Sequence, residues 1–447
     1  MKYQFNPKIF KAYDVRGLLN EEELSSQTAF FIGACFGSFI KSGKVAVGGD
    51  ARSSSNKLKS QLIKGLLQMG IDVVDIGVVP TPLCYFAVPH LKLDGSIMVT
   101  GSHNPPEYNG FKITLKDGSL SGEELKSFIK IASEGVNFSS KEGRLEFGDI
   151  SKDYISEATR HSSFKVSKKL KIGIDAMNGS GGAVLKEICK LIPFEFVVKN
   201  AEMTGDFSKI LAEPSKPANV EMLKEFLLNE NLDIVFAFDG DADRVFMITP
   251  EKVWYGDDLT LFLAYNILKE RGQGKVIFDV KSSIVLDGEI KKLGGEPIVY
   301  KTGHSLIKQE LMRINAILAG EMSGHIYIND GKFYPFDDGI YCFIRILEYL
   351  TKIEEIPNFP HTYKTAELKL KVEDKDLFLQ ELKQKILKLN PTKILEIDGI
   401  KGYFGETSNI KSAILARKSN TEDVVIARVE SYDKDEFESL KSLLEMK

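Results

Sequence analysis

The chain has 447 residues, 43% of them hydrophobic and 27% charged, and its formal net charge is −4. This length is too great for one hydrophobic core and predicts two to four domains. The composition is that of an ordinary soluble globular protein, and no basic arm or stripe indicates nucleic acid as a partner.

Neither end of the chain nor any internal stretch indicates a membrane. The opening MKYQFNPKIF has no apolar signal-peptide core, and no uncharged stretch approaches the about 18 residues that a membrane span needs. The cysteines form no CxxC pair, which argues against a zinc site or a disulfide framework and favours a reducing compartment. They are Cys35, Cys84, Cys189 and Cys342. A cytoplasmic location is therefore expected.

A short pattern occurs three times along the chain. Each copy is a lysine, a run rich in β-branched residues, and an aspartate followed by small or polar residues, which is typical of a buried parallel strand that ends in a turn. The copies are KVAVGGD from Lys44, KIGIDAMNG from Lys171 and KVIFDVKSS from Lys275. A second apolar strand follows each copy after roughly 20 to 26 residues, and a third strand closes each unit.

The segments between these strands favour helices. In residues 56–69 the apolar side chains form one face, and Gly70 is a natural helix stop. The fold class expected from this pattern is α/β, with three related domains whose sheets are mixed and mostly parallel. From about Tyr363 the pattern is lost, and a strand, a helix and short strands predict a smaller C-terminal α+β domain. The predicted boundaries are 1–148, 149–249, 250–362 and 363–447.

Each unit carries a polar motif just after its third strand, at the sheet edge where ligands of open α/β sheets bind. In the second unit this motif is DGDADR, residues 239–244, which sets Asp239, Asp241 and Asp243 at alternate positions. An EF-hand is excluded, because Arg244 and Pro250 stand where glycine and glutamate are needed, and the oxygen ligands suit Mg²⁺. A solvated acidic turn and the D-x-D motif of a HAD-like phosphatase are the alternatives.

The first unit carries GSHNPP. Ser102 lies in no GxSxG elbow and has no evident triad, so it is a poor candidate for acyl transfer. On an exposed tip beside His103 it is suited to carry a phosphoryl group, whose oxygen would complete the metal site. Lys112, expected at the start of the following strand, is a candidate donor or proton shuttle. The alternative is a simple turn with a capping serine.

The third unit carries two candidate loops. In GEMSGH the side chains of Glu321 and Ser323 are able to grip two adjacent sugar hydroxyls, whereas His325 alone favours a packed or loop histidine. KTGHS places His304 on the loop after the second strand of the unit.

Two further stretches carry cations. Arg417 opens RKSNT, which offers hydroxyls, an amide and backbone N–H groups as an anion cradle, although a plain hairpin loop is the alternative. Near the start, FKAYDVRG supplies Tyr13 and Arg16.

Seven motifs in chain order resemble those of the α-D-phosphohexomutase superfamily, and within it the bacterial phosphomannomutase/phosphoglucomutase group. They are FKAYDVRG, TGSHNPPEYNGFK, DGDADR, KTGHS, GEMSGH, FDDGI and RKSNTE. The resemblance implies four domains in a heart-shaped arrangement around a central cleft. It also implies an isomerase that converts hexose 6-phosphate reversibly to hexose 1-phosphate, with one Mg²⁺ per chain, a phosphoserine and a hexose 1,6-bisphosphate intermediate.

The resemblance also implies roles for individual residues. It assigns the transfer chemistry to Ser102, His103, Lys112, Arg16, Arg244 and His304. It assigns Mg²⁺ to phosphorylated Ser102 with Asp239, Asp241 and Asp243. Glu321 and Ser323 would bind the sugar hydroxyls O3 and O4. The non-reacting phosphate would be held by Tyr13, Lys281, Arg417, Ser419, Asn420 and Thr421.

Two motifs bear on which sugar is used. A phosphoglucosamine mutase is expected to read GEQSGH and FGTDGIRG, so Met322 and KAYDVRG favour mannose and glucose. Because O3 and O4 are oriented alike in these two sugars, dual specificity is expected. A HAD-like phosphatase with Asp239 as nucleophile and a non-catalytic sugar-phosphate-binding protein are more distant alternatives. The partners are small hexose phosphates, without nucleic acid or membrane, and the protein is expected to be a monomer or a dimer.

Four departures from the family pattern stand out. Gly49 replaces a usual arginine, so a contact near Ser102 is expected to be missing or replaced. Asp423 replaces a usual proline beside the phosphate-binding motif. The segment GDFSKILAEPSKPANV lacks the usual histidines, and Ala242 replaces a common glycine, which is a mild change.

Overall fold

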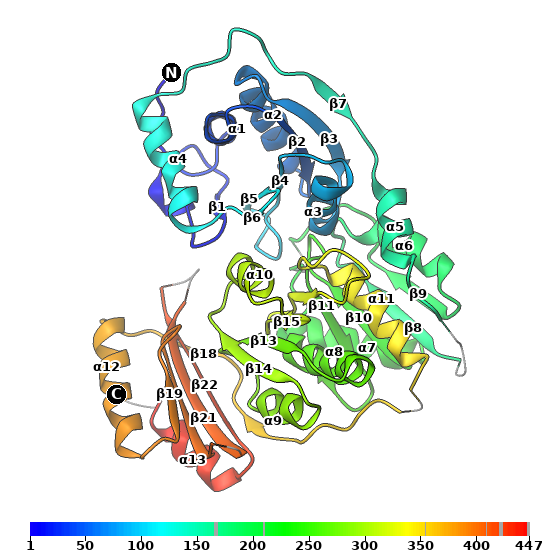
Figure 1. The fold of residues 1–447 in the computed structure, drawn as a ribbon, viewed down its shortest axis with the longest axis vertical. Coiled ribbons are helices and arrows are strands. Elements are labelled where there is room, and N and C mark those ends of the chain that lie inside the picture. Colours follow the sequence, from blue (N-terminus) through cyan, green and yellow to red (C-terminus); the bar gives the residue numbers. More distant parts are fainter. Residues whose placement is uncertain (165–168, 209–210, 354, 408, 420–422, 445–447) are drawn as a thin grey trace.

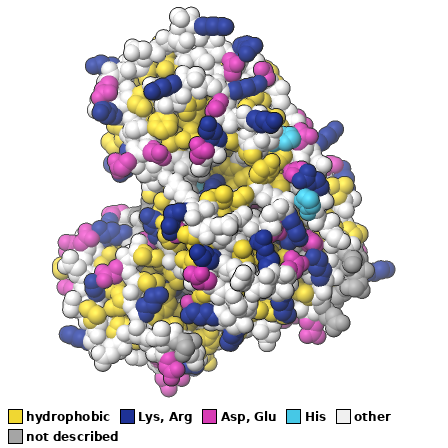
Figure 2. All heavy atoms as spheres, in the orientation of Figure 1, with side chains coloured by type: hydrophobic (Ala, Val, Ile, Leu, Met, Phe, Trp, Pro, Cys, Tyr) yellow, Lys and Arg dark blue, Asp and Glu magenta, His cyan; other side chains and the backbone are white. Residues whose placement is uncertain are grey.

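The structure, a computed structural model, describes residues 1–164, 169–208, 211–353, 355–407, 409–419 and 423–444. Within them the strands form four sheets, each with its own helices (Figure 1). In the view of Figure 1 the first sheet lies at the top, the second and third lie together below it, and the C-terminal sheet lies at the lower left. Figure 2 shows that the surface is indented between the top and lower-left lobes. The predicted four-domain α/β architecture is confirmed.

The first sheet has seven strands in the order β1-β5-β4-β2-β3-β7, with β6 paired to β5. Its elements are η1 (Pro7–Ile9), β1 (Val15–Leu18), α1 (Ser26–Ile40), β2 (Lys44–Gly49), α2 (Ser55–Gln68), β3 (Asp72–Val78), α3 (Thr81–His90), β4 (Gly95–Val99), β5 (Tyr108–Leu115), β6 (Gly118–Ser119), α4 (Gly122–Glu134) and β7 (Leu145–Phe147).

The second and third sheets have the orders β12-β11-β10-β8-β9 and β14-β13-β15-β16. The elements of the second are α5 (Ser151–Thr159), β8 (Lys171–Asp175), α6 (Gly182–Leu191), β9 (Glu195–Lys199), α7 (Pro217–Asn229), β10 (Ile234–Phe238), β11 (Val245–Ile248) and β12 (Val253–Trp254). Those of the third are α8 (Gly256–Arg271), β13 (Lys275–Asp279), α9 (Val285–Lys292), β14 (Glu296–Tyr300), α10 (His304–Arg313), β15 (Leu318–Gly320), β16 (Ile326–Ile328) and α11 (Gly339–Leu350).

These three sheets share one topology. In each, the first strand of the repeat pairs in parallel with the second strand on one side and the third on the other. A fourth strand then runs antiparallel to the third. Each polar motif is therefore the turn between the third and fourth strands of its unit. The sheets are mixed, as predicted, and the parallel pairs form their centres.

The C-terminal sheet is largely antiparallel, with β17-β22-β21-β20-β19 in order and β18 beside β22. Its elements are β17 (Tyr363–Lys364), β18 (Leu368–Leu370), α12 (Lys375–Lys388), β19 (Lys393–Leu395), β20 (Ile400–Glu406), β21 (Asn409–Lys418), β22 (Val425–Ser431) and α13 (Lys434–Ser442). The hairpin expected between the last two strands is present as β21 and β22. The predicted boundaries between domains stay predictions.

The cores explain why three sheets sit together and the fourth sits apart. The largest buried cluster contains side chains from the first, second and third sheets, and Phe343 of α11 contacts Phe236 of β10 with 4.9 Å between ring centroids. The C-terminal sheet has its own cluster, and the small cluster of Ile284, Tyr403 and Ala413 is the apolar contact it makes with the third sheet. None of the helices in the described residues is both long and apolar enough to cross a membrane.

The helix and strand positions expected from sequence differ slightly from those in the structure. The helix expected at 56–69 is α2, which buries Leu58, Leu62 and Leu66, and Gly70 follows it with φ +79°. Lys112 lies in the middle of β5 rather than at its start, because that strand already begins at Tyr108. His304 is the first residue of α10 rather than a loop residue.

Candidate active site

Ser102 lies on the tight turn between β4 and β5. Its backbone has φ +47°, a region that non-glycine residues rarely adopt and that the surrounding contacts must hold. The Oγ atom donates to Asp239 Oδ2 at 2.8 Å and lies 3.1 Å from His103 Nδ1. A Cβ at Gly240 would lie 2.6 Å from the Ser102 carbonyl oxygen, so the DGDADR loop needs glycine there to approach this turn.

The buried guanidinium of Arg52 holds this turn from below. It donates to the carbonyl oxygens of Ser102 at 2.8 Å, of Asn104, and of Pro105 at 2.7 Å, and it pairs with Asp50. Asp50 in turn accepts from Thr100 Oγ1 and from the N–H of residue 101. The turn is thus supported by an arginine three residues after Gly49. Nothing in the sequence pattern identified Arg52.

The three carboxylates of DGDADR are buried and converge. One oxygen from each of Asp239, Asp241 and Asp243 lies within 4.8 Å of the others. Lys112 Nζ donates to Asp241 at 2.7 Å and to Asp243, and the first turn of α3 adds Thr81 Oγ1, which donates to Asp241 at 2.5 Å. Burial, together with the neighbouring carboxylates, holds the pKa of Asp239 well above its usual value. Against the effect of burial, Lys112 lowers the pKa of Asp241.

The donor set fits a divalent metal ion. Asp241 Oδ1 and Asp243 Oδ1 are buried and lack a hydrogen-bond partner among the described residues, and buried carboxylate oxygens without a partner are costly. Hard oxygen donors of this kind suit Mg²⁺. Ala242 has φ +55° in this loop, a conformation that glycine adopts with less strain. The replacement of the family's common glycine by alanine therefore adds backbone strain at this position.

A layer of histidines covers the carboxylates. His325 Nε2 accepts from Arg244 Nε at 2.9 Å, and its Nδ1 lies 3.6 Å from Asp243 Oδ1 and 3.4 Å from Asp337 Oδ2. His304 stacks on His325 with 5.4 Å between centroids. Burial holds the pKa of His304 well below its usual value. His325, for which the sequence favoured a packed or loop histidine, is buried in the turn before β16 and lies within the polar cluster.

Cations surround the same cluster. Arg16 of β1 donates to the carbonyl of residue 101, to Asn104 Oδ1 at 3.1 Å and to Asp14 at 2.7 Å. Arg244 donates its N–H to Asp239, and Tyr13 packs edge-on against His304 at 4.8 Å. Lys308, which the sequence reading did not single out, pairs with Asp337 at 3.0 Å. Ser102, His103, Lys112, Arg16, Arg244, His304 and Tyr13 thus lie together.

The loops of the third unit meet at Asp279, the last residue of β13. Its carboxylate accepts from Ser282, from Thr302 Oγ1 at 3.2 Å and from the N–H of Met322. Glu321 is buried, accepts from the N–H of residue 303 at 2.9 Å, and leaves Oε2 without a partner in the described part of the chain. Burial raises its pKa. Ser323 is half-buried beside it.

A second group of cations lies where the third and fourth sheets meet. Lys281 pairs with Glu367 at 3.0 Å, and Arg417, near the end of β21, pairs with Asp398 at 2.9 Å. Arg428 of β22, which the sequence reading missed, donates to the carbonyl of Lys281 and to Met322 Sδ. Ser419 is half-buried, and its N–H donates to Val424. The predicted ligands Asn420 and Thr421 lie outside the described residues.

The loop from Lys301 to His304 joins the two groups. Thr302 N donates to Asp398, the partner of Arg417, while the next N–H donates to Glu321 and His304 stacks on His325. Tyr13, predicted to hold the non-reacting phosphate, lies with the transfer residues instead. The transfer residues form one centre and Lys281, Arg417 and Ser419 the other, on either flank of one sugar-binding candidate, Glu321. The residues missed from sequence, Arg52, Lys308, Asp337 and Arg428, act through contacts with residues far along the chain, which local motifs do not reveal.

The chain thus has four α/β and α+β domains with two polar centres, one rich in buried carboxylates and one rich in cations. Four profiles of one family match the chain in order: phosphoglucomutase/phosphomannomutase alpha/beta/alpha domains I, II and III at residues 7–136, 152–252 and 255–361, and the C-terminal domain at 367–445. The chain belongs to the phosphoglucomutase/phosphomannomutase family, which confirms the predicted superfamily and isomerase class.

Individual relatives agree with this placement. The chain is 35% identical to a phosphomannomutase/phosphoglucomutase of Pseudomonas putida, over 97% of this chain and 94% of the relative. It is 36% identical to a phosphoglucomutase of Neisseria gonorrhoeae, over 95% and 93%. A probable phosphoglucosamine mutase of Pyrococcus horikoshii is 32% identical, over 97% and 96%. Among solved structures, a phosphoglucomutase/phosphomannomutase family protein of Burkholderia thailandensis superposes with TM-score 0.89 at 32% identity, over 99% and 97%.

Proposed function

We propose that the protein catalyses the reversible conversion of mannose or glucose 6-phosphate to the 1-phosphate, through phosphorylated Ser102 and a hexose 1,6-bisphosphate. The observation that carries this proposal is the hydrogen bond of 2.8 Å from Ser102 Oγ to Asp239, within a buried triad of carboxylates. A hydroxyl on a strained, well-held turn beside a cation site is suited to carry and pass on a phosphoryl group. Family membership and the names of the relatives support the same reaction.

The metal proposed for the triad is Mg²⁺, held by Asp239, Asp241 and Asp243 with the phosphate of Ser102. When bound, the ion would neutralise charge on the phosphoryl group. In support, one oxygen each of Asp241 and Asp243 is buried and lacks a hydrogen-bond partner in the part of the chain that the structure describes. Lys112 pairs with Asp243, Arg244 Nε lies 3.8 Å from Asp239, and Arg16 donates to the carbonyl of residue 101, so all three add positive charge near the triad.

In the proposed transfer, the phosphoryl group moves from Ser102 to the hexose. The free hydroxyl of the hexose attacks the phosphorus, the new bond from oxygen to phosphorus forms, and the bond from Ser102 Oγ to phosphorus breaks. The hexose hydroxyl gives up its proton to a neighbouring base as the new bond forms, and the departing Ser102 Oγ takes up a proton from a neighbouring acid. His103, 3.1 Å from Ser102 Oγ, and Lys112 and His304 nearby are the proposed proton carriers and charge stabilisers.

The second centre explains how one site serves both ends of the sugar. We assign the non-reacting phosphate to Lys281, Arg417 and Ser419, with Asn420 and Thr421 as proposed by family resemblance, and we add Arg428. Glu321 and Ser323 between the two centres would grip the sugar hydroxyls. After the first transfer the bisphosphate turns end for end, and its other phosphate returns to Ser102. Each predicted domain then contributes one loop to the reaction.

A coupled assay on separate substrates tests the proposed activity. We expect turnover of mannose and glucose phosphates that stops when Mg²⁺ is chelated and returns when it is added. Ser102→Ala should abolish turnover, whereas Ser133→Ala, an exposed serine of α4, should leave it unchanged. If only glucosamine phosphate turned over, the substrate would be the one named for the Pyrococcus horikoshii relative, and not mannose or glucose phosphate. Release of inorganic phosphate without isomerisation would favour a phosphatase, and binding without turnover a sugar-phosphate-binding protein.

A further inference from the structure

One face of α10 carries both a histidine assigned to the reaction and a buried lysine. His304 opens the helix and Lys308 follows four residues later, so their side chains lie on the same face. Both are buried, and both face the carboxylate of Asp337, which lies 3.6 Å from His304 Nδ1 and 3.0 Å from Lys308 Nζ. The helix therefore brings an imidazole and an ammonium group to the same buried acid.

A third group beside Asp337 is the imidazole of His325. Its Nδ1 lies 3.4 Å from Asp337 Oδ2 and 3.6 Å from Asp243 Oδ1, close enough for these three residues to hold a metal ion. The hydrogen bond from Arg244 argues against that role. A guanidinium only donates, so His325 Nε2 accepts and the neutral ring carries its hydrogen on Nδ1. This Nδ1–H faces the carboxylates as a donor and not as a metal ligand.

The charge of Asp337 is thus balanced by Lys308. Against the effect of burial, Lys308 holds the pKa of Asp337 well below its usual value, and the two histidines add to this effect. Burial holds the pKa of His304 well below its usual value, although Asp337 raises it, and further lowering comes from His325, Lys112 and Lys308. A neutral His304 with Nδ1–H toward the carboxylate keeps a lone pair on Nε2. This Nε2 is buried and has no hydrogen-bond partner in the part of the chain that the structure describes.

Contacts with the first unit hold Lys308 in place. Its Nζ donates to Ser119 Oγ of β6 at 3.3 Å and lies 3.7 Å from the ring centroid of Tyr85 on α3. The neighbouring Gln309 reaches the same strand, since its amide donates to the carbonyl of Ser119 at 3.3 Å. These contacts fix the ammonium group beside Asp337.

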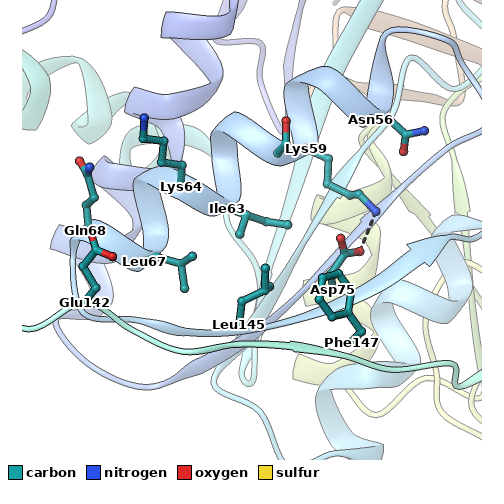
Figure 3. A pocket seen from close by; sticks show the side chains of 11 residues that line it. Asn56, Lys59, Ile63, Lys64, Leu67, Gln68, Asp75, Glu142, Leu145 and Phe147 are labelled. Carbon is teal, nitrogen blue, oxygen red and sulfur yellow. Dashed lines mark hydrogen bonds and ion pairs between the residues drawn. The ribbon is translucent and has the colours of Figure 1, made fainter.

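A second buried lysine pairs with a carboxylate in a more open place. Lys59 of α2 donates to Asp75 of β3 at 2.6 Å, and both residues line a surface pocket of about 530 Å³ between α2 and β7 (Figure 3). The side chains of Lys59 and Lys308 are equally exposed, at 9%, but Asp75 is 13% exposed and Asp337 is 0% exposed. Solvent in the pocket would hydrate Asp75 if its lysine were lost, whereas Asp337 would need a charge from a neighbouring histidine.

We propose that Lys308 is a positioning residue of the phosphoryl transfer, which as the counter-ion of Asp337 leaves His304 neutral, with Nε2 free to accept the proton of the hexose hydroxyl. This inference rests on the proposed function and makes it more specific. As the bond from the hexose oxygen to phosphorus forms, the bond from that oxygen to its hydrogen breaks, and the proton passes to Nε2. The imidazolium lies beside the ionised Asp337, which stabilises it. Lys308 acts through Asp337.

Steady-state kinetics of Lys308→Met test this role. Methionine keeps an unbranched stem without the charge, so Asp337 draws a proton onto His304 and the base is lost. We expect kcat at neutral pH to fall at least about tenfold, with KM within about twofold of the parent value. Lys308→Arg restores the charge and should retain most of the activity.

Two variants are matched controls for lost packing. Gln309→Ala weakens the neighbouring contact between α10 and β6, and Lys59→Met removes a buried lysine from another carboxylate. Both should keep kcat within about twofold of the parent value, even where stability falls. If either control lowered kcat as much as Lys308→Met, lost packing would explain the effect and the proposal would fail.

A double-mutant cycle tests whether Lys308 acts through Asp337. In an Asp337→Asn background there is no charge for Lys308 to balance, so adding Lys308→Met should cause no further fall in kcat. Two effects that multiply would overturn the proposal, because Lys308 would then act on another group.

Nitrogen-15 NMR of the histidine rings tests the charge without any turnover. The signals of His304 are those lost in His304→Gln. We expect a neutral ring with its hydrogen on Nδ1 in the parent chain and an imidazolium in Lys308→Met, which leaves in place the other groups that face His304, namely Asp337, His325, Lys112 and Tyr13. The same charge in both chains would overturn the proposal. A parent chain without mutase activity would instead overturn the proposed function, and the NMR result would still stand.

Discussion

At the scale of single residues, the position of Ser102 depends on a residue that no motif identified. Arg52 donates to three carbonyl groups of the turn, and a fourth contact reaches the carbonyl of Tyr108 at 3.2 Å. The planar guanidinium with five donors suits this task, and an ammonium group with three donors in a different geometry does not. Arg52 is thus a positioning residue, since it acts on the reaction through the turn it holds.

Arg52→Lys is therefore expected to leave buried carbonyl oxygens without donors. We expect a loss of about 2–4 kcal/mol in the free energy of unfolding and at least a tenfold fall in kcat with a small change in KM. Chemical denaturation and steady-state kinetics measure the two effects. Arg313→Lys, an exposed arginine that pairs with Glu310, is the matched control and should change neither. An unchanged kcat for Arg52→Lys would show that the turn holds its shape without this residue.

The metal assignment leads to a prediction for Asp241. Asp241→Asn removes one anionic ligand while preserving the size of the side chain, so Mg²⁺ affinity should fall at least about tenfold. Titration calorimetry of Mg²⁺ with the unphosphorylated protein gives this affinity without reference to activity. Asp175→Asn is the control, because Asp175 ends β8 of the same sheet but contacts Asn200 and the N–H of Met177 instead. Equal Mg²⁺ affinity in both variants would remove Asp241 from the metal site.

At the scale of elements, α11 carries a titratable cap. Asp338 is its N-cap, accepts from Tyr341 N at 2.8 Å and from the Tyr154 hydroxyl, and is buried. Burial raises its pKa from 3.8 to about 7, against the effect of these hydrogen bonds. The folded chain therefore keeps this proton at a pH where the unfolded chain has lost it. The contribution of Asp338 to stability is then present below about pH 4 and is lost as the pH rises toward 7.

Asp338→Asn should remove this pH dependence, because asparagine caps a helix equally well and does not ionise. The difference in the free energy of unfolding, variant minus parent, should rise between about pH 4 and 7 by up to about 4 kcal/mol and stay flat above. Urea denaturation at a series of pH values measures it. A difference that does not change over this range would show that Asp338 is ionised in the folded chain at low pH.

The elements themselves were largely predictable. Short apolar runs predict the nine repeated strands, and one apolar face predicts α2, because these signals depend only on neighbours in sequence. The aspartates at the end of the first strand of each unit were visible as a pattern. Asp50, Asp175 and Asp279 each accept a backbone N–H from the loop that follows that strand.

Other parts of the site could not be predicted in this way. The importance of His325 depends on Asp337 and Arg244, which lie far from each other in sequence and meet only when the second and third units pack together. The start of α10 at His304 rather than a loop depends on the same packing. Long-range contacts of this kind leave no local pattern.

At the scale of the whole molecule, the fourth sheet is attached differently from the other three. The largest buried cluster contains side chains of the first three sheets. The fourth sheet contributes no buried residue to it and meets the third through a small apolar cluster, Tyr432 and several buried polar groups. Glu430 accepts from Ser283 Oγ, from Ile284 N at 3.0 Å and from Thr362 Oγ1. Lys401 donates to the carbonyl oxygens of Val280 and Ser282. Polar interfaces of this kind permit movement between domains, so we expect the fourth sheet to move as a lid over the site.

Glu430→Ala should release the fourth sheet, because three buried donors lose their acceptor together. Small-angle scattering should show a larger radius of gyration for this variant, and a parent chain that becomes more compact with hexose phosphate. Glu438→Ala, an exposed glutamate of α13 that pairs with Lys441, should scatter like the parent. A parent chain whose scattering is the same with and without substrate would argue against a mobile lid.

The central claim is that Ser102 carries the phosphoryl group, and phosphopeptide mapping with intact mass tests it most directly. The purified protein would be measured before and after incubation with glucose 1,6-bisphosphate and Mg²⁺. We predict one added phosphate, on Ser102, that is stable to acid and is lost when mannose 6-phosphate or glucose 6-phosphate is added. Absence of phosphate on Ser102 under every condition, or an alkali-labile phosphate on Asp239, would contradict the account.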